Sequence, residues 1–239
     1  MKKLKFTFKN AAGEELAGLL ELPENPKAFA LLAHCFTCGK DLKGAARIAR
    51  KLTENAIAVL RFDFTGLGNS EGDFSNTNFS SNISDLLCAV DYLRRQYEAP
   101  SLLIGHSLGG SAILSIAGEV PEAKAVVTIG SPGELTHVKR LFKDDVENIN
   151  QHGAYPVELA GRVFTLKKQM LDNIQEHKIA HKVFAMNKPL LIFHATEDDT
   201  VLIEQAEKIF KAAKHPKSLI SLGKADRLLT HAQDAAYAA

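Results

Sequence analysis

Short, mostly apolar runs recur along this chain and alternate with segments of helical spacing. A run such as Ala28-Phe-Ala-Leu-Leu-Ala33 is typical of a strand that is buried on both faces of a parallel sheet. Similar runs lie at 57–62, 101–105, 125–130, 189–194 and 217–222. Between them, apolar residues recur at helical spacing over 42–54, 81–98, 108–118 and 201–213, and Ser80 or Ser81 is the expected N-cap of the second helix. This alternation predicts an α/β fold with a mostly parallel, doubly wound sheet.

Two segments depart from the alternation. Residues 3–9 and 15–21 alternate polar and apolar side chains around a turn at 10–13, which predicts an antiparallel N-terminal hairpin with a half-solvated edge. Later, about 55 residues separate two neighbouring apolar runs, far more than an ordinary connection needs. We expect a helix (138–150), a hairpin (154–166) and a second helix (166–179) there, forming an inserted helical cap at about 133–187. Without repeats or linkers, residues 1–239 are predicted to form a single domain.

Charge and composition exclude several classes of protein. The chain has 29 Lys+Arg and 28 Asp+Glu, so it lacks the excess of positive charge that binding to nucleic acid or an anionic membrane requires. No apolar run approaches the roughly 18 residues of a membrane span. Three cysteines are too few for a disulfide framework and fit a reducing cytosol. We therefore expect a cytoplasmic protein with a small-molecule partner, no nucleic acid and no membrane, while the oligomeric state stays open.

The strongest motif is Gly105-His-Ser-Leu-Gly-Gly110, which fits G-x-S-x-G. It follows an apolar run and opens a helix of small residues. A serine at such a sharp strand-to-helix turn has strained backbone angles, which are tolerated only when its neighbours lack bulk. The turn exposes the hydroxyl of Ser107, and the helix N-terminus offers N–H groups to an oxyanion. Ser107 is therefore the candidate nucleophile, and the backbone N–H of Leu108 is a candidate oxyanion donor.

A second motif, His34-Cys-Phe-Thr-Cys38, directly follows the run at 28–33. In hydrolases built around such an elbow, this loop supplies the second oxyanion N–H, which here points to Phe36. The same letters form C-x-x-C between a strand and a helix, the placement of a thioredoxin-like redox pair. A redox role and two half-buried thiols that pack beneath the loop are the alternatives for the sulfur atoms.

An acidic residue is expected after the next-to-last strand, where Glu197, Asp198 and Asp199 stand in a row. Asp198 lies three residues before Val201, which matches the D-x-x-V spacing usual at this position. Its neighbours are better explained as solvated or helix-terminal charges. Asp198 is therefore the candidate orienting acid.

Together these motifs make the chain similar to the α/β-hydrolase superfamily over its whole length. It most resembles a bacterial serine-hydrolase branch that is often fused to an OsmC-like peroxidase domain. The matching stretches are residues 34–41, 61–74, 76–80, 105–109 and 211–217. The resemblance implies an α/β-hydrolase fold, a Ser–Asp–His triad and hydrolysis of carboxylic esters.

The chain departs from this branch at the general base. The branch has Gly-Ala-Asp-His-Leu-Leu after the last strand, whereas this chain has Gly-Lys-Ala-Asp-Arg-Leu-Leu at 223–229. The guanidinium of Arg227 does not deprotonate near neutral pH, so it can only pair with Asp198 or hold an oxyanion. Of the nine histidines, the order Ser–Asp–His leaves His215 and His231. His215 precedes the last strand, so His231 is the candidate base.

The sequence thus predicts a serine esterase that hydrolyses small to medium carboxylic esters through an acyl-enzyme on Ser107. No metal or organic cofactor is expected. The residues expected to bind substrate are His34 and three from the cap, Phe142, Phe164 and Met170. The alternative is a catalytically impaired hydrolase-fold protein used for binding, because Arg227 occupies the usual position of the base.

Overall fold

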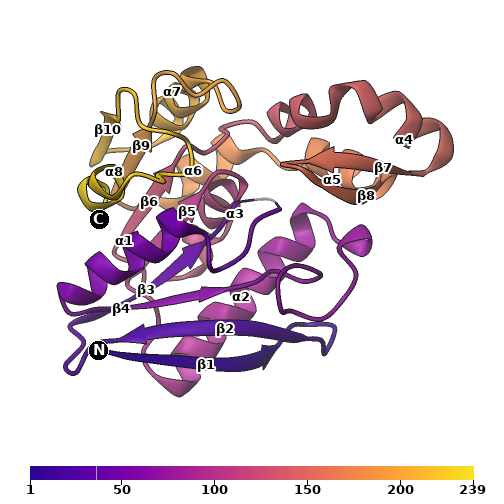
Figure 1. Cartoon of the computed structure of the whole chain (residues 1–239). Helices are drawn as coiled ribbons and strands as arrows, with labels where there is room; N and C mark the ends of the chain where they lie inside the picture. Colours follow the sequence, from indigo (N-terminus) through magenta and orange to yellow (C-terminus); the bar gives the residue numbers. More distant parts are fainter. Residues whose placement is uncertain (36) are drawn as a thin grey trace.

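The computed structural model describes residues 1–35 and 37–239 and is built on an eight-stranded, mostly parallel sheet (Figure 1). The strand order is β1-β2-β4-β3-β5-β6-β9-β10. The bounds are β1 (Lys2–Lys9), β2 (Glu15–Leu22), β3 (Ala28–Ala33), β4 (Ile57–Phe62), β5 (Leu102–His106), β6 (Ala125–Ile129), β9 (Leu190–His194) and β10 (Lys217–Ser221). The six apolar runs coincide with the six parallel strands to within a residue at each end, which confirms the predicted fold class.

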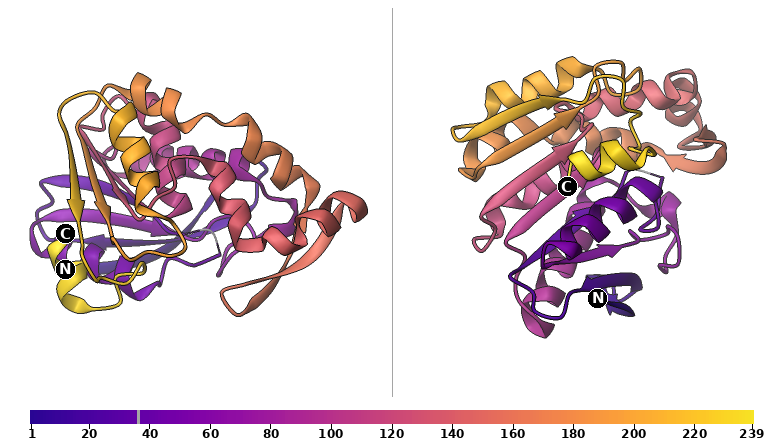
Figure 2. Two further views of the ribbon diagram at one scale, coloured as in Figure 1. Left: turned by 90° about the horizontal axis from the view of Figure 1, so that it is seen from above. Right: turned by 60° about the vertical axis from the view of Figure 1, so that its left-hand side comes forward.

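Helices cover both faces of the sheet. The helix α1 (Lys43–Glu54) packs beside the C-terminal helix α8 (Ala232–Tyr237) on one face (Figure 2). The other face carries α2 (Phe79–Gln96), α3 (Leu108–Ile116), α6 (Ile179–Met186) and α7 (Ile203–Ala212). The N-cap of α2 is Asn78 rather than Ser80 or Ser81, because Asn78 and Ser81 exchange the two hydrogen bonds of a capping box. Within the described residues, no helix is both long and apolar enough to cross a membrane.

The N-terminal hairpin forms as predicted, but only its outer strand is half-solvated. Strand β1 pairs antiparallel with β2, and β2 pairs antiparallel with β4 on its other side. Because β2 is flanked by two strands, its interior residues are all buried. One of them, Glu21, forms a buried ion pair with Arg61 of β4 at 2.6 Å.

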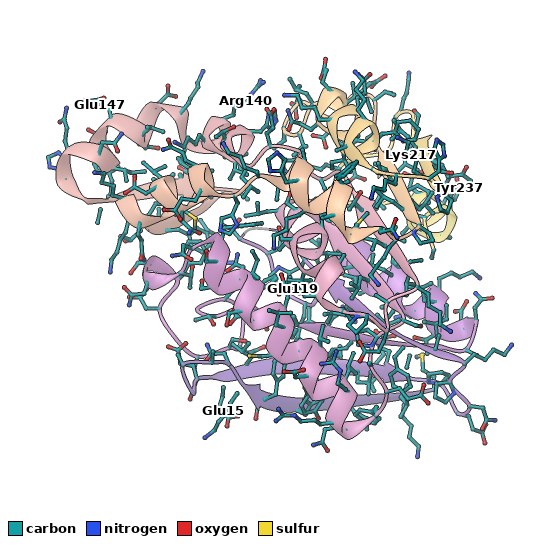
Figure 3. All side chains as sticks on the ribbon, turned by 180° about the vertical axis from the view of Figure 1, so that it is seen from behind. Glu15, Glu119, Arg140, Glu147, Lys217 and Tyr237 are labelled. Atoms are coloured by element: carbon teal, nitrogen blue, oxygen red, sulfur yellow. A yellow bond between two sulfur atoms is a disulfide. The ribbon has the colours of Figure 1, made fainter. Side chains whose placement is uncertain are left out.

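Most of the long segment between β6 and β9 forms a projection that is not part of the main sheet. It contains the 3₁₀ segment η3 (Leu135–Asp145), α4 (Val146–His152), the hairpin β7 (Ala154–Leu159) and β8 (Arg162–Lys167), and α5 (Lys168–Glu176). The order helix, hairpin, helix agrees with the expectation, and Glu147 lies toward the outer end (Figure 3). The next helix, α6, packs on α3 and α7 and so lies in the helical layer of the sheet. The projection overhangs the carboxyl ends of the parallel strands.

Candidate active site

Ser107 is the single residue between strand β5 and helix α3. Its backbone has φ 54° and ψ −128°, a conformation that few non-glycine residues adopt. Its N–H donates to the carbonyl of Ile129 at 2.8 Å, which ties the turn to the neighbouring strand β6. The local backbone is therefore the strained elbow that the G-x-S-x-G motif predicts.

The glycines around Ser107 are required by close backbone packing. A Cβ on Gly105 would lie 2.3 Å from the Cα of Gly110, and a Cβ on Gly109 would lie 2.2 Å from the carbonyl oxygen of His34. Both distances are shorter than real Cβ contacts. The motif thus lets α3 start directly above β5 and against the end of β3. The first N–H groups of α3, including that of Leu108, have no acceptor within the helix.

Asp198 is fixed in the turn that follows strand β9. Its Oδ1 accepts the N–H groups of Thr200 and Val201, both at 2.9 Å, which explains the D-x-x-V spacing. Its Oδ2 is buried and has no hydrogen-bond partner in the described part of the chain. The adjacent carboxylates of Glu197 and Asp199 are exposed, so Asp198 is the one carboxylate of the three that faces the interior.

Arg227 lies in the loop between β10 and α8, close to Asp198. A Cβ built on Gly130 would have Asp198 Oδ2 at 3.6 Å and Arg227 Cγ at 3.7 Å, so the stem of the arginine passes beside the carboxylate. The loop is held by His106, whose Nε2 donates to the carbonyl of Arg227 at 2.7 Å. Burial lowers the pKa of His106 to about 4, so its ring is neutral at physiological pH.

His231 does not reach this site. The carboxylate of Asp226 accepts the N–H groups of Leu228 and Thr230, at 3.0 and 2.9 Å, and closes a tight turn. The chain then enters α8 with His231 exposed at the N-cap. The same turn therefore places Arg227 beside Asp198 and His231 outside.

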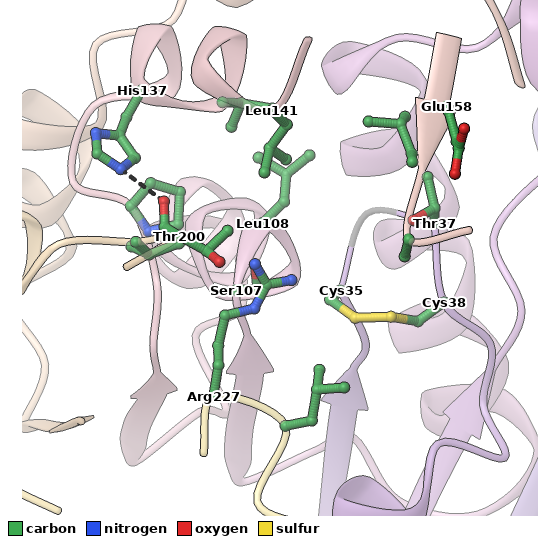
Figure 4. A pocket seen from close by; sticks show the side chains of 16 residues that line it. Cys35, Thr37, Cys38, Ser107, Leu108, His137, Leu141, Glu158, Thr200 and Arg227 are labelled. Atoms are coloured by element: carbon green, nitrogen blue, oxygen red, sulfur yellow. Dashed lines mark hydrogen bonds between the residues drawn. A yellow bond between two sulfur atoms is a disulfide. The ribbon is translucent and has the colours of Figure 1, made fainter. Parts of the chain in front are cut away.

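A pocket of about 260 Å³ opens in front of Ser107, between the sheet and the projection (Figure 4). Arg227 extends into it on the side of Ser107 and Leu108. The projection contributes His137, Val138 and Leu141 from η3, and the turn 158–160 at the tip of the hairpin. The remaining wall comes from residues at the ends of the strands: Cys35, Thr37, Cys38, Pro132, Thr200, Val201 and Leu228.

The three residues of this projection that were expected to contact substrate do not line the pocket. Phe142, Phe164 and Met170 are buried in the interior of the projection and do not line this pocket. The backbone of η3 is non-helical at Phe142, and the residues of η3 that face the pocket, Val138 and Leu141, come before this kink. Phe142, Phe164 and Met170 instead pack the interior of the projection.

His34 is also buried away from the main pocket. Its Nδ1 donates to the carbonyl of Cys35 at 2.8 Å, and its ring lines a separate cavity of about 10 Å³ together with Leu108. Burial lowers the pKa of His34. It supports the loop next to the pocket rather than the pocket itself.

The loop after β3 carries a disulfide between Cys35 and Cys38. The expectation of free thiols is therefore wrong for this pair, and the third cysteine, Cys88, is free. Both bridged cysteines line the pocket opposite Arg227 (Figure 4). Phe36, the expected second oxyanion donor, falls outside the described residues.

Sequence reasoning missed His137 as a pocket residue. Its Nε2 donates to the carbonyl of Thr200 at 3.0 Å, and burial lowers its pKa. No sequence motif surrounds His137, so its place in the pocket is revealed only by its contact with the turn after β9. Across residues 1–35 and 37–239, no three His, Cys, Asp or Glu side chains gather closely enough to hold a metal ion.

Comparison with known proteins agrees with this geometry. The family model of serine aminopeptidase, S33, matches residues 24–143. The mitochondrial palmitoyl-protein thioesterase ABHD10 of Bos taurus is 26% identical over 151 residues, which are 60% of this chain and 48% of that protein. The chain therefore matches about half the length of this relative. These matches support the resemblance to the α/β-hydrolase superfamily, while the closer resemblance to the branch often fused to an OsmC-like domain stays a prediction.

Solved structures are similar over almost the whole chain. The esterase domain of a Rhodothermus marinus protein is 45% identical with a TM-score of 0.79, and the match covers 99% of this chain and 94% of that one. Est1E from Butyrivibrio proteoclasticus, solved with ferulic acid, is 22% identical with a TM-score of 0.78 over 98% and 95% of the two chains, which is a likeness of fold. These relatives support a hydrolase of the esterase kind. With one family model matching half of its length and a related esterase domain matching nearly all of it, the chain belongs to the serine aminopeptidase S33 family of α/β hydrolases.

Proposed function

We propose that this protein is a serine esterase that cleaves small to medium carboxylic esters through an acyl-enzyme on Ser107. The observation that carries the proposal is the strained elbow, which aims Ser107 into a pocket of about 260 Å³. A strained non-glycine backbone is kept where function requires it. The esterase domain that is 45% identical supports ester substrates for this pocket.

In the proposed reaction the Ser107 hydroxyl oxygen attacks the ester carbonyl. The negative charge that develops on the carbonyl oxygen is stabilised by the N–H of Leu108 at the start of α3. The loop of Phe36 supplies the second donor, as the sequence motif predicts. The tetrahedral intermediate then collapses, the departing alkoxide takes a proton from water and leaves as the alcohol, and a second water molecule hydrolyses the acyl group from Ser107.

The proton acceptor distinguishes this site from an ordinary triad. In the described part of the chain, the Ser107 hydroxyl has no hydrogen bond to a histidine, and Arg227 extends toward it from beside Asp198. A guanidinium cannot accept a proton, but its positive charge favours the ionised form of a nearby hydroxyl. We infer that water in the open pocket accepts the proton, that acylation is slow, and that the rate rises with pH.

Labelling with a fluorophosphonate probe tests the nucleophile. We expect the probe to modify Ser107, and the Ser107→Ala variant to lose both labelling and hydrolysis of p-nitrophenyl butyrate. The buried Ser111, which donates to the carbonyl of Pro132, provides a matched control, because Ser111→Ala leaves Ser107 in place. Absence of labelling in the parent protein would contradict the proposal and favour a binding protein.

Arg227→His tests the role of the missing base. An imidazole at this position would lie near both Asp198 Oδ2 and Ser107, so we expect kcat/KM for p-nitrophenyl esters to rise by about a hundredfold or more. Asp198→Asn in the same background should remove the gain, whereas Asp199→Asn, at an exposed neighbour, should keep it. An Arg227→His variant no faster than the parent would overturn this account of the site.

A further inference from the structure

Arg227 brings an unpaired positive charge into the pocket. Its guanidinium has no hydrogen bond or ion pair within residues 1–35 and 37–239, although its stem passes beside Asp198. The fully buried Arg61, by contrast, is held by the carboxylate of Glu21 and the carbonyl of Lys40. A partly buried charge without a direct partner is costly, so a site that keeps one is arranged for a ligand that supplies the partner.

The carboxylates nearby do not neutralise Arg227 directly. Asp198 uses Oδ1 for two backbone N–H groups, and within the described residues neither of its oxygens forms an ion pair with the guanidinium. Figure 4 shows the guanidinium of Arg227 in the pocket on the side of Ser107. Glu158, also on the pocket wall, belongs to the hairpin on the opposite side and is exposed.

The rest of the wall strengthens an ionic contact at this point. Apolar groups line the pocket, and they come from Leu108, Pro132, Val138, Leu141 and Val201. Charges attract more strongly beside apolar walls than in open water. The pocket therefore combines a small apolar volume with one cation next to the nucleophile.

We propose that Arg227 anchors a carboxylate subsite, so that the pocket takes esters whose acyl part ends in a free carboxylate, such as monoesters of short dicarboxylic acids. This inference rests on the proposed esterase function for its substrate class, but the subsite itself is a binding property. The planar guanidinium matches a carboxylate through two parallel hydrogen bonds. The volume of about 260 Å³ suits a short acid rather than a long acyl chain.

Binding to an inactive variant tests the subsite without turnover. Monomethyl succinate, an anion, and methyl butyrate, its neutral counterpart, are titrated calorimetrically into Ser107→Ala. We expect the anion to bind at least about tenfold more weakly when Arg227→Gln is added, while Arg227→Lys retains part of the affinity. Exposed Arg140 on the cap gives a control of equal charge, because Arg140→Gln should leave binding unchanged.

The outcomes separate the subsite from other roles of Arg227. Circular dichroism first checks that Ser107→Ala and the double variant Ser107→Ala/Arg227→Gln are both folded. If both then bind the anion equally well, the proposal is overturned. The proposal would also be overturned if Arg227→Gln and Arg140→Gln lowered the affinity for the anion equally, because this would indicate a general attraction between the anion and positive charge. Selective binding of the anion supports the subsite even if no ester is hydrolysed, so failure of the esterase proposal is distinguishable. With turnover, Arg227→Gln should raise KM for p-nitrophenyl hemisuccinate by a larger factor than KM for p-nitrophenyl butyrate, and equal changes for the two esters would count against the subsite.

Discussion

At the scale of single residues, hydrogen bonds to Asp226 fix which side chain of its loop faces Ser107. The carboxylate of Asp226 accepts two backbone N–H groups and the hydroxyl of Thr230. The turn also contacts α1 closely, since a Cβ on Gly44 would lie 2.0 Å from the carbonyl oxygen of Leu228. The loop is therefore fixed at both ends, and it holds Arg227 in the pocket and His231 in solvent.

His231→Ala should leave ester hydrolysis within about threefold of the parent, because an exposed N-cap residue contributes mainly to helix stability. The measurement is kcat/KM for p-nitrophenyl butyrate, with Ser107→Ala as the inactive reference. A loss of several orders of magnitude would show instead that His231 acts together with Ser107 as the base. The loop would then have to adopt a second conformation during catalysis.

At the scale of elements, the antiparallel addition of the hairpin buries a charge pair inside the sheet. Arg61 and Glu21 lie on adjacent strands, and their side chains are 2% and 0% exposed. Arg61 also donates to the carbonyl of Lys40 in the loop after β3. This pair links the outer hairpin to the loop that borders the pocket.

Glu21→Gln should lower the free energy of unfolding by about 3 kcal/mol, because it leaves the guanidinium of Arg61 buried without its counter-charge. Urea denaturation measures the change. The matched control is Glu54→Gln, which removes the same charge from an exposed pair with Lys51 and should cost at most about 0.5 kcal/mol. If the two variants lowered the free energy of unfolding by similar amounts, the buried pair would stabilise the protein no more than the exposed pair does.

At the scale of the whole molecule, buried histidines make stability depend on pH. Burial lowers the pKa of His106 to about 4 and lowers the pKa of His34, His137 and His177. Such a histidine binds fewer protons when folded, so its contribution is complete above about pH 6.5 and is lost as the pH falls. Burial raises the pKa of Asp85 to about 6, which acts in the opposite sense, but the histidines outnumber it.

The free energy of unfolding should therefore decrease between pH 7 and pH 5. His106→Gln should reduce that decrease by on the order of 2 kcal/mol, since the unfolded parent gains a proton that the folded parent cannot accept. Urea denaturation at both pH values provides the measurement. Exposed His152→Gln is the control, and it should keep the full pH dependence of the parent. An unchanged dependence in His106→Gln would contradict the prediction.

The sequence predicts the sheet well because each buried parallel strand is a continuous apolar run. It predicts the elbow because three glycines leave room for a close packing that a Cβ would prevent. It predicts the burial of β2 less well, since alternation in the hairpin does not reveal that β4 pairs with its second side. The position of His231 could not be predicted by counting residues. It depends on the local hydrogen bonds that the carboxylate of Asp226 accepts and on the contact of Leu228 with Gly44, a residue far away in the chain.

Because the Cys35–Cys38 disulfide forms part of the pocket wall, the chemistry of that wall depends on the redox conditions around the protein. The bridge spans residues only three apart, so in the chain-entropy account it contributes less to global stability than a bridge that closes a long loop. Reduction would leave the sheet and its helices intact and would replace the bridge by two thiols facing Ser107 and Arg227. A cellular dithiol could thus alter which acids fit the pocket, without unfolding the protein.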